Sequence, residues 1–247
     1  MMNRSEIQLI VFDFFGTLVK NEASEWQQTL KNIAVDQNLP VEGIDFWLEF
    51  SKHEVNFRKT RTNMIDPDSS PTFRTYREAW RDAFLETFAG MSISGDADAA
   101  ADYSIERLTD QEPFQDSDET LKALSAHTDV AVLSNADDRF LHGSIQYNQW
   151  AFKYIESSES LESYKPDPRI FARFIDKTGI DPAQVIYVGD SIYDDAHGSK
   201  LAGMISILVN RDQQTPGRTP PPDTGEILKP DYTIHSLSEL PILLDGD

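Results

Sequence analysis

Short apolar runs with the length of buried strands occur once near the start of the chain and repeatedly after residue 113. The first run covers residues 7–15 and ends at Gly16. Runs that are apolar at successive positions are typical of parallel strands covered on both faces. Further strands are predicted at residues 129–134, 185–190, 205–209 and 232–234.

Helical patterns separate these later runs. Helices are predicted at residues 117–126, 170–177 and 196–201, and from residue 236 onward. The alternation of strand and helix predicts right-handed crossovers and a parallel sheet with helices on both faces, which is an α/β fold. Residues 211–226 are rich in proline, threonine and glycine and are predicted to form a surface loop.

Residues 21–110 show helical spacing without any strand pattern. Three apolar faces contain Trp26, Leu30 and Ile33; Phe46, Phe50, His53 and Phe57; and Phe73, Tyr76, Trp80, Phe84 and Phe88. A fourth, alanine-rich helix is predicted between residues 96 and 108. We interpret these faces as the packing surfaces of a small helical bundle. We therefore predict a core domain formed by residues 1–19 and 112–247, with a helical domain at residues 20–111 inserted into it.

The composition narrows the possible partners. The 247 residues carry a formal net charge of −20, so nucleic acid and anionic membranes would be repelled. The chain contains no cysteine, which excludes disulfides and thiolate catalysis. Its first residues lack the pattern of a signal peptide, and no apolar run reaches the length of a membrane span. We therefore expect a soluble, cytoplasmic protein that acts on a small molecule.

Three predicted strands end in polar residues, namely Asp13, Ser134 and Asp190. Ligands of parallel sheets bind beyond the carboxyl ends of the strands. Asp195 follows Asp190 by five residues, so the two carboxylates could present oxygens to one Mg²⁺ ion. Lys165, just before a predicted helix, could add a positive charge.

These residues occur in an order and spacing that resemble a known family. The motifs are Asp13-Phe14-Phe15-Gly16-Thr17, Leu133-Ser134-Asn135, Lys165, and Gly189-Asp190-Ser191 with Asp195. Together they resemble the haloacid dehalogenase-like hydrolase superfamily, in the subfamily with a helical cap of the C1 type inserted after the first motif. The resemblance covers nearly the whole chain and implies a Rossmann-like core with a mobile cap.

The resemblance also implies roles for individual residues. Asp13 would attack the substrate and form a covalent aspartyl intermediate, while Thr17, Ser134 and Lys165 would hold the transferred group. The implied catalytic set is Asp13, Thr17, Ser134, Asn135 and Lys165. The implied Mg²⁺ ligands are Asp13, the backbone carbonyl of Phe15, Asp190 and, directly or through water, Asp195.

Phe15 departs from the pattern of the family's phosphatases, which have an aspartate there. That aspartate protonates the leaving group and then activates water, and such help contributes ~10²–10⁴-fold to the rate. A phosphatase with Phe15 needs a good leaving group, a proton from solvent, or an acid from the cap, for which His53 and Glu54 are the nearest candidates. The family's dehalogenases also have an aromatic residue there, because halide leaves without a proton. They work without metal, however, and lack the Gly-Asp pair that is intact here at Gly189-Asp190.

We therefore expect a Mg²⁺-dependent hydrolase, and we favour a phosphatase acting on a small phosphorylated metabolite. The alternatives are a 2-haloacid dehalogenase, a phosphonate-cleaving enzyme that uses Lys52 as a Schiff base, and a non-catalytic protein that binds a phosphorylated metabolite. Lys52 is otherwise interpreted as an exposed helix residue. Candidate contacts for an anionic substrate in the cap are Arg58, Arg61, Arg74 and Arg77.

Overall fold

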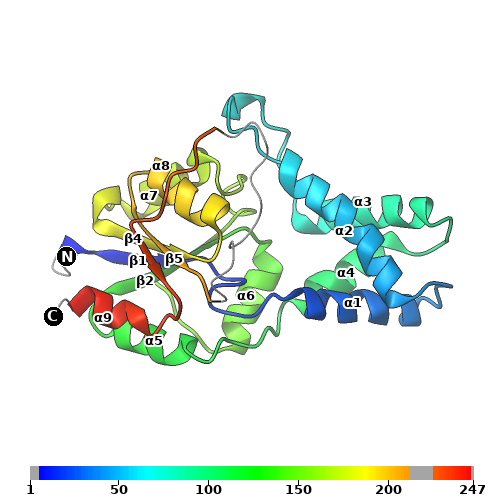
Figure 1. The fold of residues 1–247 in the computed structure, drawn as a ribbon, viewed down its shortest axis with the longest axis horizontal. Coiled ribbons are helices and arrows are strands. Elements are labelled where there is room, and N and C mark those ends of the chain that lie inside the picture. The colour runs from blue at the N-terminus through cyan, green and yellow to red at the C-terminus, as the bar shows by residue number, and fades with distance from the viewer. Residues whose placement is uncertain (1–5, 212–224, 246–247) are drawn as a thin grey trace.

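A parallel sheet of six strands forms the centre of the larger lobe (Figure 1). The structure is a computed structural model that describes residues 6–211 and 225–245. The strands are β1 (Leu9–Phe12), β2 (Asp129–Ser134), β3 (Tyr154–Ser157), β4 (Val185–Gly189), β5 (Ile205–Val209) and β6 (Tyr232–Ile234). Their order across the sheet is β3-β2-β1-β4-β5-β6.

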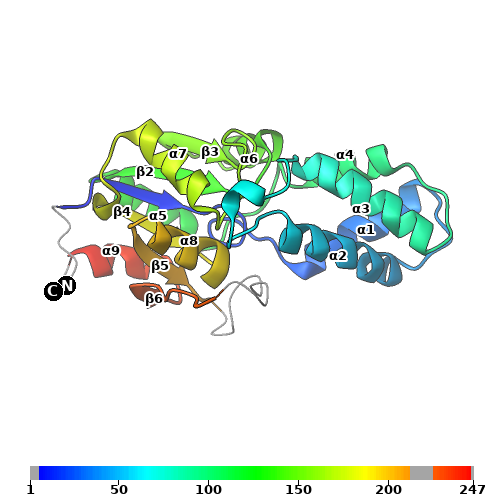
Figure 2. The ribbon, with the colours of Figure 1, turned by 90° about the horizontal axis from the view of Figure 1, so that it is seen from above.

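Helices cover both faces of this sheet (Figures 1 and 2). They are α5 (Ser117–Ser125), α6 (Asp138–Tyr147), α7 (Pro168–Thr178), α8 (Gly198–Leu201) and α9 (Glu239–Asp245). Side chains of β1 alternate between the two faces: Leu9 and Val11 pack in the cluster that contains Phe171 of α7, whereas Ile10 and Phe12 pack with the residues of α5 and α9. The predicted α/β fold with helices on both faces is confirmed.

The smaller lobe is a bundle of four helices. They are α1 (Ala23–Asp36), α2 (Gly43–Thr60), α3 (Tyr76–Gly90) and α4 (Ala97–Arg107). Successive helices pack on one another and α1 also contacts α4, which closes the bundle. Phe46, Phe50, Phe84 and Phe88 are buried in contact with one another inside it. These four rings therefore pack against one another, as predicted. The boundaries of the inserted domain at residues 20 and 111 stay a prediction.

At the start of helix α3, backbone N–H groups donate to the carboxylates of Glu78 and Asp137. Within the bundle, Thr75 and Glu78 form a reciprocal capping box at its first turn. From the core, Asp137 accepts hydrogen bonds from the backbone N–H groups of Tyr76 at 2.6 Å and Arg77 at 2.9 Å. The tyrosine hydroxyl of Tyr164 also donates to the carbonyl of Arg74. These contacts fix the start of α3 to the core.

Several elements differ from the sequence prediction. Strand β3 and helix α6 were not predicted, and Phe73 lies outside α3. The ladder of the first strand covers only Leu9–Phe12, because the chain turns after Asp13. A π-helical segment, η4 (Ile192–His197), precedes α8, and short 3₁₀ turns lie at Pro67–Ser69 (η2) and Pro182–Gln184 (η3). Most of the loop predicted at residues 211–226 lies outside the described residues. No helix among the described residues is both long and apolar enough to cross a membrane.

Candidate active site

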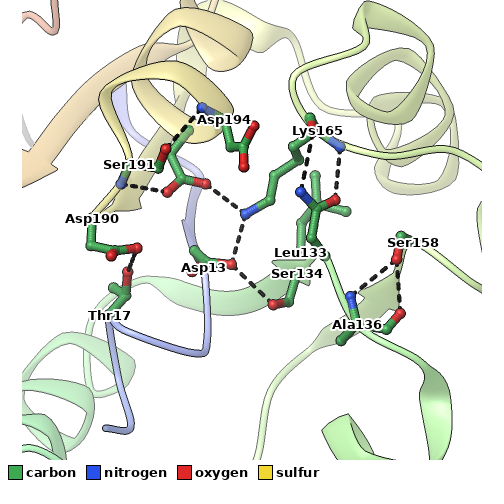
Figure 3. Close-up of polar contacts among 12 residues, drawn as sticks. Asp13, Thr17, Leu133, Ser134, Ala136, Ser158, Lys165, Asp190, Ser191 and Asp194 are labelled. Carbon is green, nitrogen blue, oxygen red and sulfur yellow. Dashed lines mark hydrogen bonds and ion pairs between the residues drawn. The ribbon is translucent and has the colours of Figure 1, made fainter. Parts of the chain in front are cut away.

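Asp13 lies where β1 ends and the chain turns toward the bundle. Its backbone N–H donates to the carbonyl of Val188 at 2.8 Å, which holds the residue in line with β4. The turn requires Gly16, whose φ is +93°, and a Cβ there would lie 2.7 Å from a carboxylate oxygen of Asp190. Because β2, β1 and β4 are neighbours in the sheet, Ser134, Asp13 and Asp190 meet at the carboxyl ends of these strands, as predicted (Figure 3).

Lys165 occupies the centre of the site and is 1% exposed. Its ammonium group donates to Asp13 Oδ1 at 2.7 Å, to Asp195 Oδ1 at 2.6 Å and to the hydroxyl of Tyr187 at 2.8 Å. All three of its protons are therefore engaged. Burial opposes the charge of Lys165, but the carboxylates of Asp13 and Asp195 outweigh burial and hold its pKa well above the usual value.

Ser134 and Asn135 act on the two central groups from the end of β2. The hydroxyl of Ser134 donates to Asp13 Oδ1 at 2.9 Å, so that oxygen accepts from both Ser134 and Lys165. The side-chain amide of Asn135 accepts from the backbone N–H of Lys165 at 2.8 Å and donates to its carbonyl at 3.2 Å. Asn135 therefore positions Lys165. Thr17 is fully buried and donates to Asp190 Oδ1 at 3.4 Å, and its predicted role of holding the transferred group stays a prediction.

The three carboxylates of the site repel one another in a buried environment. Burial, followed by the charges of Asp195 and Asp13, raises the pKa of Asp190 well above its usual value. Burial also raises the pKa of Asp195 to about 7, although Lys165 opposes that shift. Without a bound cation, the close approach of these three carboxylates is therefore electrostatically unfavourable in the folded protein.

The residues present fit Mg²⁺. Asp13, Asp190 and Asp195 each offer a carboxylate oxygen, and these atoms lie within 4.8 Å of one another. Oxygen-only ligands are those that Mg²⁺ prefers. When all three carboxylates are ionised, they and the ammonium group of Lys165 leave two negative charges uncompensated, which a divalent cation would balance. Asp195 already accepts from Lys165 on one oxygen and from the backbone N–H of Ser191, at 2.9 Å, on the other. The roles of Asp195 and of the Phe15 carbonyl as ligands stay predictions.

Tyr187 was not identified from the sequence. It lies in β4 among fully buried apolar residues, and its hydroxyl donates to the carbonyl of Leu133 at 2.7 Å while accepting from Lys165. Burial raises its pKa well above the usual value, so it remains protonated. Its only signal in the sequence is a single hydroxyl inside an otherwise apolar strand.

Phe15 forms part of the wall of the site. Its ring packs edge-on against Phe14 and Phe140, with centroids 5.0 and 5.2 Å away. The position that holds an acid in the family's phosphatases is therefore filled by an apolar ring facing the cavity.

A cavity of about 460 Å³ opens above Asp13 between the sheet edge and the bundle. Of the four predicted arginines, Arg58 and Arg61 line it. Arg61 is buried, donates to the hydroxyl of Tyr76 and lies 3.5 Å from Asp194. Arg58 pairs with Glu54 at 2.6 Å, and its side chain is 40% exposed. Lys165, Arg58 and Arg61 therefore place three cationic side chains in the lining of this cavity.

The other cap candidates lie elsewhere among the described residues. Arg74 pairs with Asp82, and Arg77 pairs with Asp102, on the surface of the bundle. His53 pairs with Glu86 at 2.6 Å and lines neither the cavity above Asp13 nor the cavity that contains Glu54. Lys52 pairs with Glu49, and its side chain is 67% exposed, which favours the interpretation as a surface residue over a Schiff-base role. Glu54 lines a second cavity, described below.

Comparison with known proteins assigns the family. The family model described as haloacid dehalogenase-like hydrolase matches residues 7–203. The chain therefore belongs to the haloacid dehalogenase-like hydrolases, and it is a hydrolase by family, as the sequence motifs predicted.

Curated relatives include both dehalogenases and phosphatases. The (S)-2-haloacid dehalogenase 4A of Burkholderia cepacia is 31% identical over 130 residues, which are 51% of this chain and 53% of that protein. Haloacid dehalogenase-like hydrolase domain-containing protein 3 of Danio rerio is 33% identical over 54% of this chain and 53% of its own length. The matches to these relatives thus span about half of their length. The N-acylneuraminate-9-phosphatase of Mus musculus is 24% identical over 99% of this chain and 96% of its own.

Solved structures share the fold along nearly the whole chain. The putative hydrolase YfnB from Bacillus subtilis, bound to magnesium, has a TM-score of 0.78 at 18% identity and covers 97% of this chain and 99% of its own. The L-2-haloacid dehalogenase from Xanthobacter autotrophicus, with chloropropionic acid covalently bound, has a TM-score of 0.74 at 20% identity and the same coverage. At these identities the likeness concerns the fold alone.

Proposed function

We propose that this hydrolase is a Mg²⁺-dependent phosphatase that acts on a small phosphorylated molecule through Asp13. The observation that carries the proposal is the intact acidic cluster of Asp13, Asp190 and Asp195 around Lys165. A cluster that needs a cation is suited to a reaction on a dianionic phosphoryl group. The cytoplasmic location predicted from the sequence remains a prediction.

The residues of the site divide the work of phosphoryl transfer. Hydrogen bonds from Ser134 and Lys165 fix the orientation of the Asp13 carboxylate, which attacks phosphorus and forms an aspartyl phosphate. The P–O bond to the leaving group breaks, and that oxygen takes a proton from solvent because Phe15 has none to give. Water then attacks phosphorus, releases phosphate and regenerates Asp13. Bound at the carboxylates, Mg²⁺ would neutralise charge on the phosphoryl oxygens.

Dehalogenation is the second candidate, and Phe15 is the observation that favours it. A halide leaves without a proton, so an apolar residue at this position costs a dehalogenase nothing. The half-length match to the Burkholderia cepacia enzyme supports the same candidate. Against it, Mg²⁺ held by Asp13 would lower the reactivity of that carboxylate toward carbon.

A paired assay on the purified protein distinguishes the candidates. Phosphate release from 4-nitrophenyl phosphate is measured with Mg²⁺ and with chelator, beside chloride release from 2-chloropropionate. Release of phosphate that depends on Mg²⁺ and disappears in Asp13→Asn supports the proposal. Chloride release at the same rate with and without chelator would overturn the proposal and identify the protein as a dehalogenase. If neither product forms and phosphate binds equally to the wild type and Asp13→Asn, the chain is a binding protein.

A further inference from the structure

A second cavity, of about 260 Å³, adjoins the one above Asp13. We name it the aromatic annexe and define it by the rings in its wall, which belong to Phe15, Trp26, Trp47, Phe50, Tyr76, Trp80 and Phe140. Both cavities share part of their lining, formed by Phe15, Asn21, Arg58, Tyr76 and Asn135. A molecule bound at Asp13 therefore has the annexe as its neighbour across the ring of Phe15.

The wall of the annexe is suited to a flat, uncharged group. Trp26 packs edge-on against Trp80 at 5.0 Å and is stacked with Phe50 at 6.3 Å. The charged groups in the lining, Glu54 and Arg58, pair with each other at 2.6 Å. Aromatic rings pack well against an aromatic wall in offset or edge-on arrangements. A charged or heavily hydroxylated group would lose hydration here, and it would find few free partners, because the side chains of Asn21, Asn135, Glu54 and Arg58 are already paired. The indole N–H of Trp80 is a buried donor of this wall without a partner among the described residues, and it could donate to a single polar substituent on a ring.

The volume of the annexe corresponds to one ring with its substituents. An apolar cavity of about 150 Å³ in another protein is large enough to bind benzene. The annexe is larger, and unlike such a cavity it opens toward the catalytic carboxylate. It therefore suits the organic part of a substrate whose reacting group lies at Asp13.

The absence of an acid at position 15 also favours a substrate with an aromatic ring. A phenolic oxygen has an ordinary pKa of about 10, whereas an alkyl alcohol is a far weaker acid, so a phenolate leaves phosphorus with little need of a proton. The replacement of an acid by Phe15 therefore costs less for an aryl phosphate than for an alkyl phosphate.

We propose that the substrate is an aryl phosphate monoester whose ring occupies the aromatic annexe while its phosphoryl group lies at Asp13. This inference rests on the proposed function. In the reaction the bond between phosphorus and the aryl oxygen breaks, the phenolate keeps the electron pair and takes a proton from water, and Asp13 gains the phosphoryl group.

Binding of unreactive analogues tests the annexe separately from turnover. Calorimetry with Mg²⁺ present compares benzylphosphonate, in which CH₂ replaces the ester oxygen of phenyl phosphate, with methylphosphonate, which has the head group alone, and with benzyl alcohol, which has the ring alone. Ala23→Phe fills the annexe from an exposed position of its lining, and Trp47→Ala removes a half-buried part of the wall. Trp150→Ala is the matched control, a half-buried tryptophan of the core that is outside both linings.

Burial of the ring should make benzylphosphonate bind roughly tenfold or more tightly than methylphosphonate. Ala23→Phe and Trp47→Ala should reduce that ratio toward one without weakening methylphosphonate, and Trp150→Ala should leave it unchanged. Equal affinity of the two phosphonates for the wild type, or an equal loss of both in the annexe variants, would overturn the inference. A third outcome is that neither phosphonate binds, while benzyl alcohol binds to the wild type and not to Ala23→Phe. This outcome would overturn both the proposed phosphatase and the aryl phosphate substrate, although it would show that the annexe binds an aromatic ring.

Discussion

The side-chain amide of Asn135 binds the backbone of Lys165 on both sides, through its N–H at 2.8 Å and its carbonyl at 3.2 Å. The two residues are 30 positions apart in the chain. The ammonium group of Lys165 in turn donates to Asp13, so Asn135 fixes the cation that orients the nucleophile.

Asn135→Ala should therefore lower kcat for phosphate release by roughly tenfold to a hundredfold, because small displacements of a positioning group have effects of this size. Asn148→Ala is the control, since the amide of Asn148 also donates to backbone carbonyls, of Gln111 and Ser144, but far from the site. Each variant loses two hydrogen bonds and about 1–3 kcal/mol of stability. Steady-state kinetics that show the same small effect in both would contradict a positioning role for Asn135.

Lys165→Met should destabilise the protein by about 3–5 kcal/mol, because it leaves Asp13 and Asp195 buried without their shared ammonium group. Mg²⁺ should restore more stability to this variant than it adds to the wild type, since the cation then replaces the lost charge. Urea unfolding with and without Mg²⁺ measures both effects.

Lys153→Met provides the comparison for Lys165→Met. Lys153 pairs with Asp129 on the surface, where both side chains are 48% exposed, and its loss should cost less than about 1 kcal/mol. An equally small effect in Lys165→Met, or a response to Mg²⁺ no larger than that of the wild type, would show that the buried charges are compensated in another way.

The residues that meet at the sheet edge were predictable because each ends an apolar run. Asp13 and Asp190 directly follow strands that the hydrophobic pattern identifies, and Ser134 is the last residue of another. The carboxyl ends of parallel strands lie on the same side of a sheet. The pattern of side chains along β4 did not identify Tyr187, because its role depends on Lys165 in another element. Hydrophobicity indicates burial, and it carries no information about which polar atom lies opposite.

The missed elements and the cap arginines show a second limit. Strand β3 is four residues long, lies at the edge of the sheet and is only partly buried, so it lacks the continuous apolar run of the inner strands. Arg61 and Arg74 both flank helices of the bundle, yet only Arg61 lines the cavity. Their difference depends on how the bundle sits against the core, which contacts such as that of Asp137 with Tyr76 determine.

Phe15→Asp should increase kcat/KM for alkyl phosphates relative to Phe15→Asn, by roughly tenfold to a hundredfold. Both variants lose the packing of the ring against Phe14 and Phe140, so their ratio reports the acid alone. For 4-nitrophenyl phosphate the same ratio should stay near one, since its leaving group needs no proton. A ratio near one for both esters would show that the position does not reach the leaving oxygen.

Asp137 provides a pH-dependent contact between core and bundle. Burial raises the pKa of Asp137 to about 6, the charges of Glu159 and Asp138 add to the shift, and the backbone N–H groups of Tyr76 and Arg77 oppose it. In the unfolded chain the pKa is about 3.9. Between these values the folded protein binds more protons at this residue than the unfolded chain does. The contribution of Asp137 to the free energy of unfolding therefore falls as the pH rises from about 4 to 6, by at most about 3 kcal/mol.

Asp137→Asn should remove this part of the pH dependence. The asparagine keeps one acceptor for the start of α3 and has no proton to lose, so the free energy of unfolding of the variant should fall less between pH 4 and 6 than that of the wild type. Urea unfolding across this range measures the difference, and taking it between the two proteins cancels the other carboxylates. Asp138→Asn, which replaces the next residue and leaves the contact with α3 in place, should retain most of the wild-type slope. Parallel curves for the wild type and Asp137→Asn would mean that Asp137 titrates as an ordinary carboxylate and does not couple the bundle to pH.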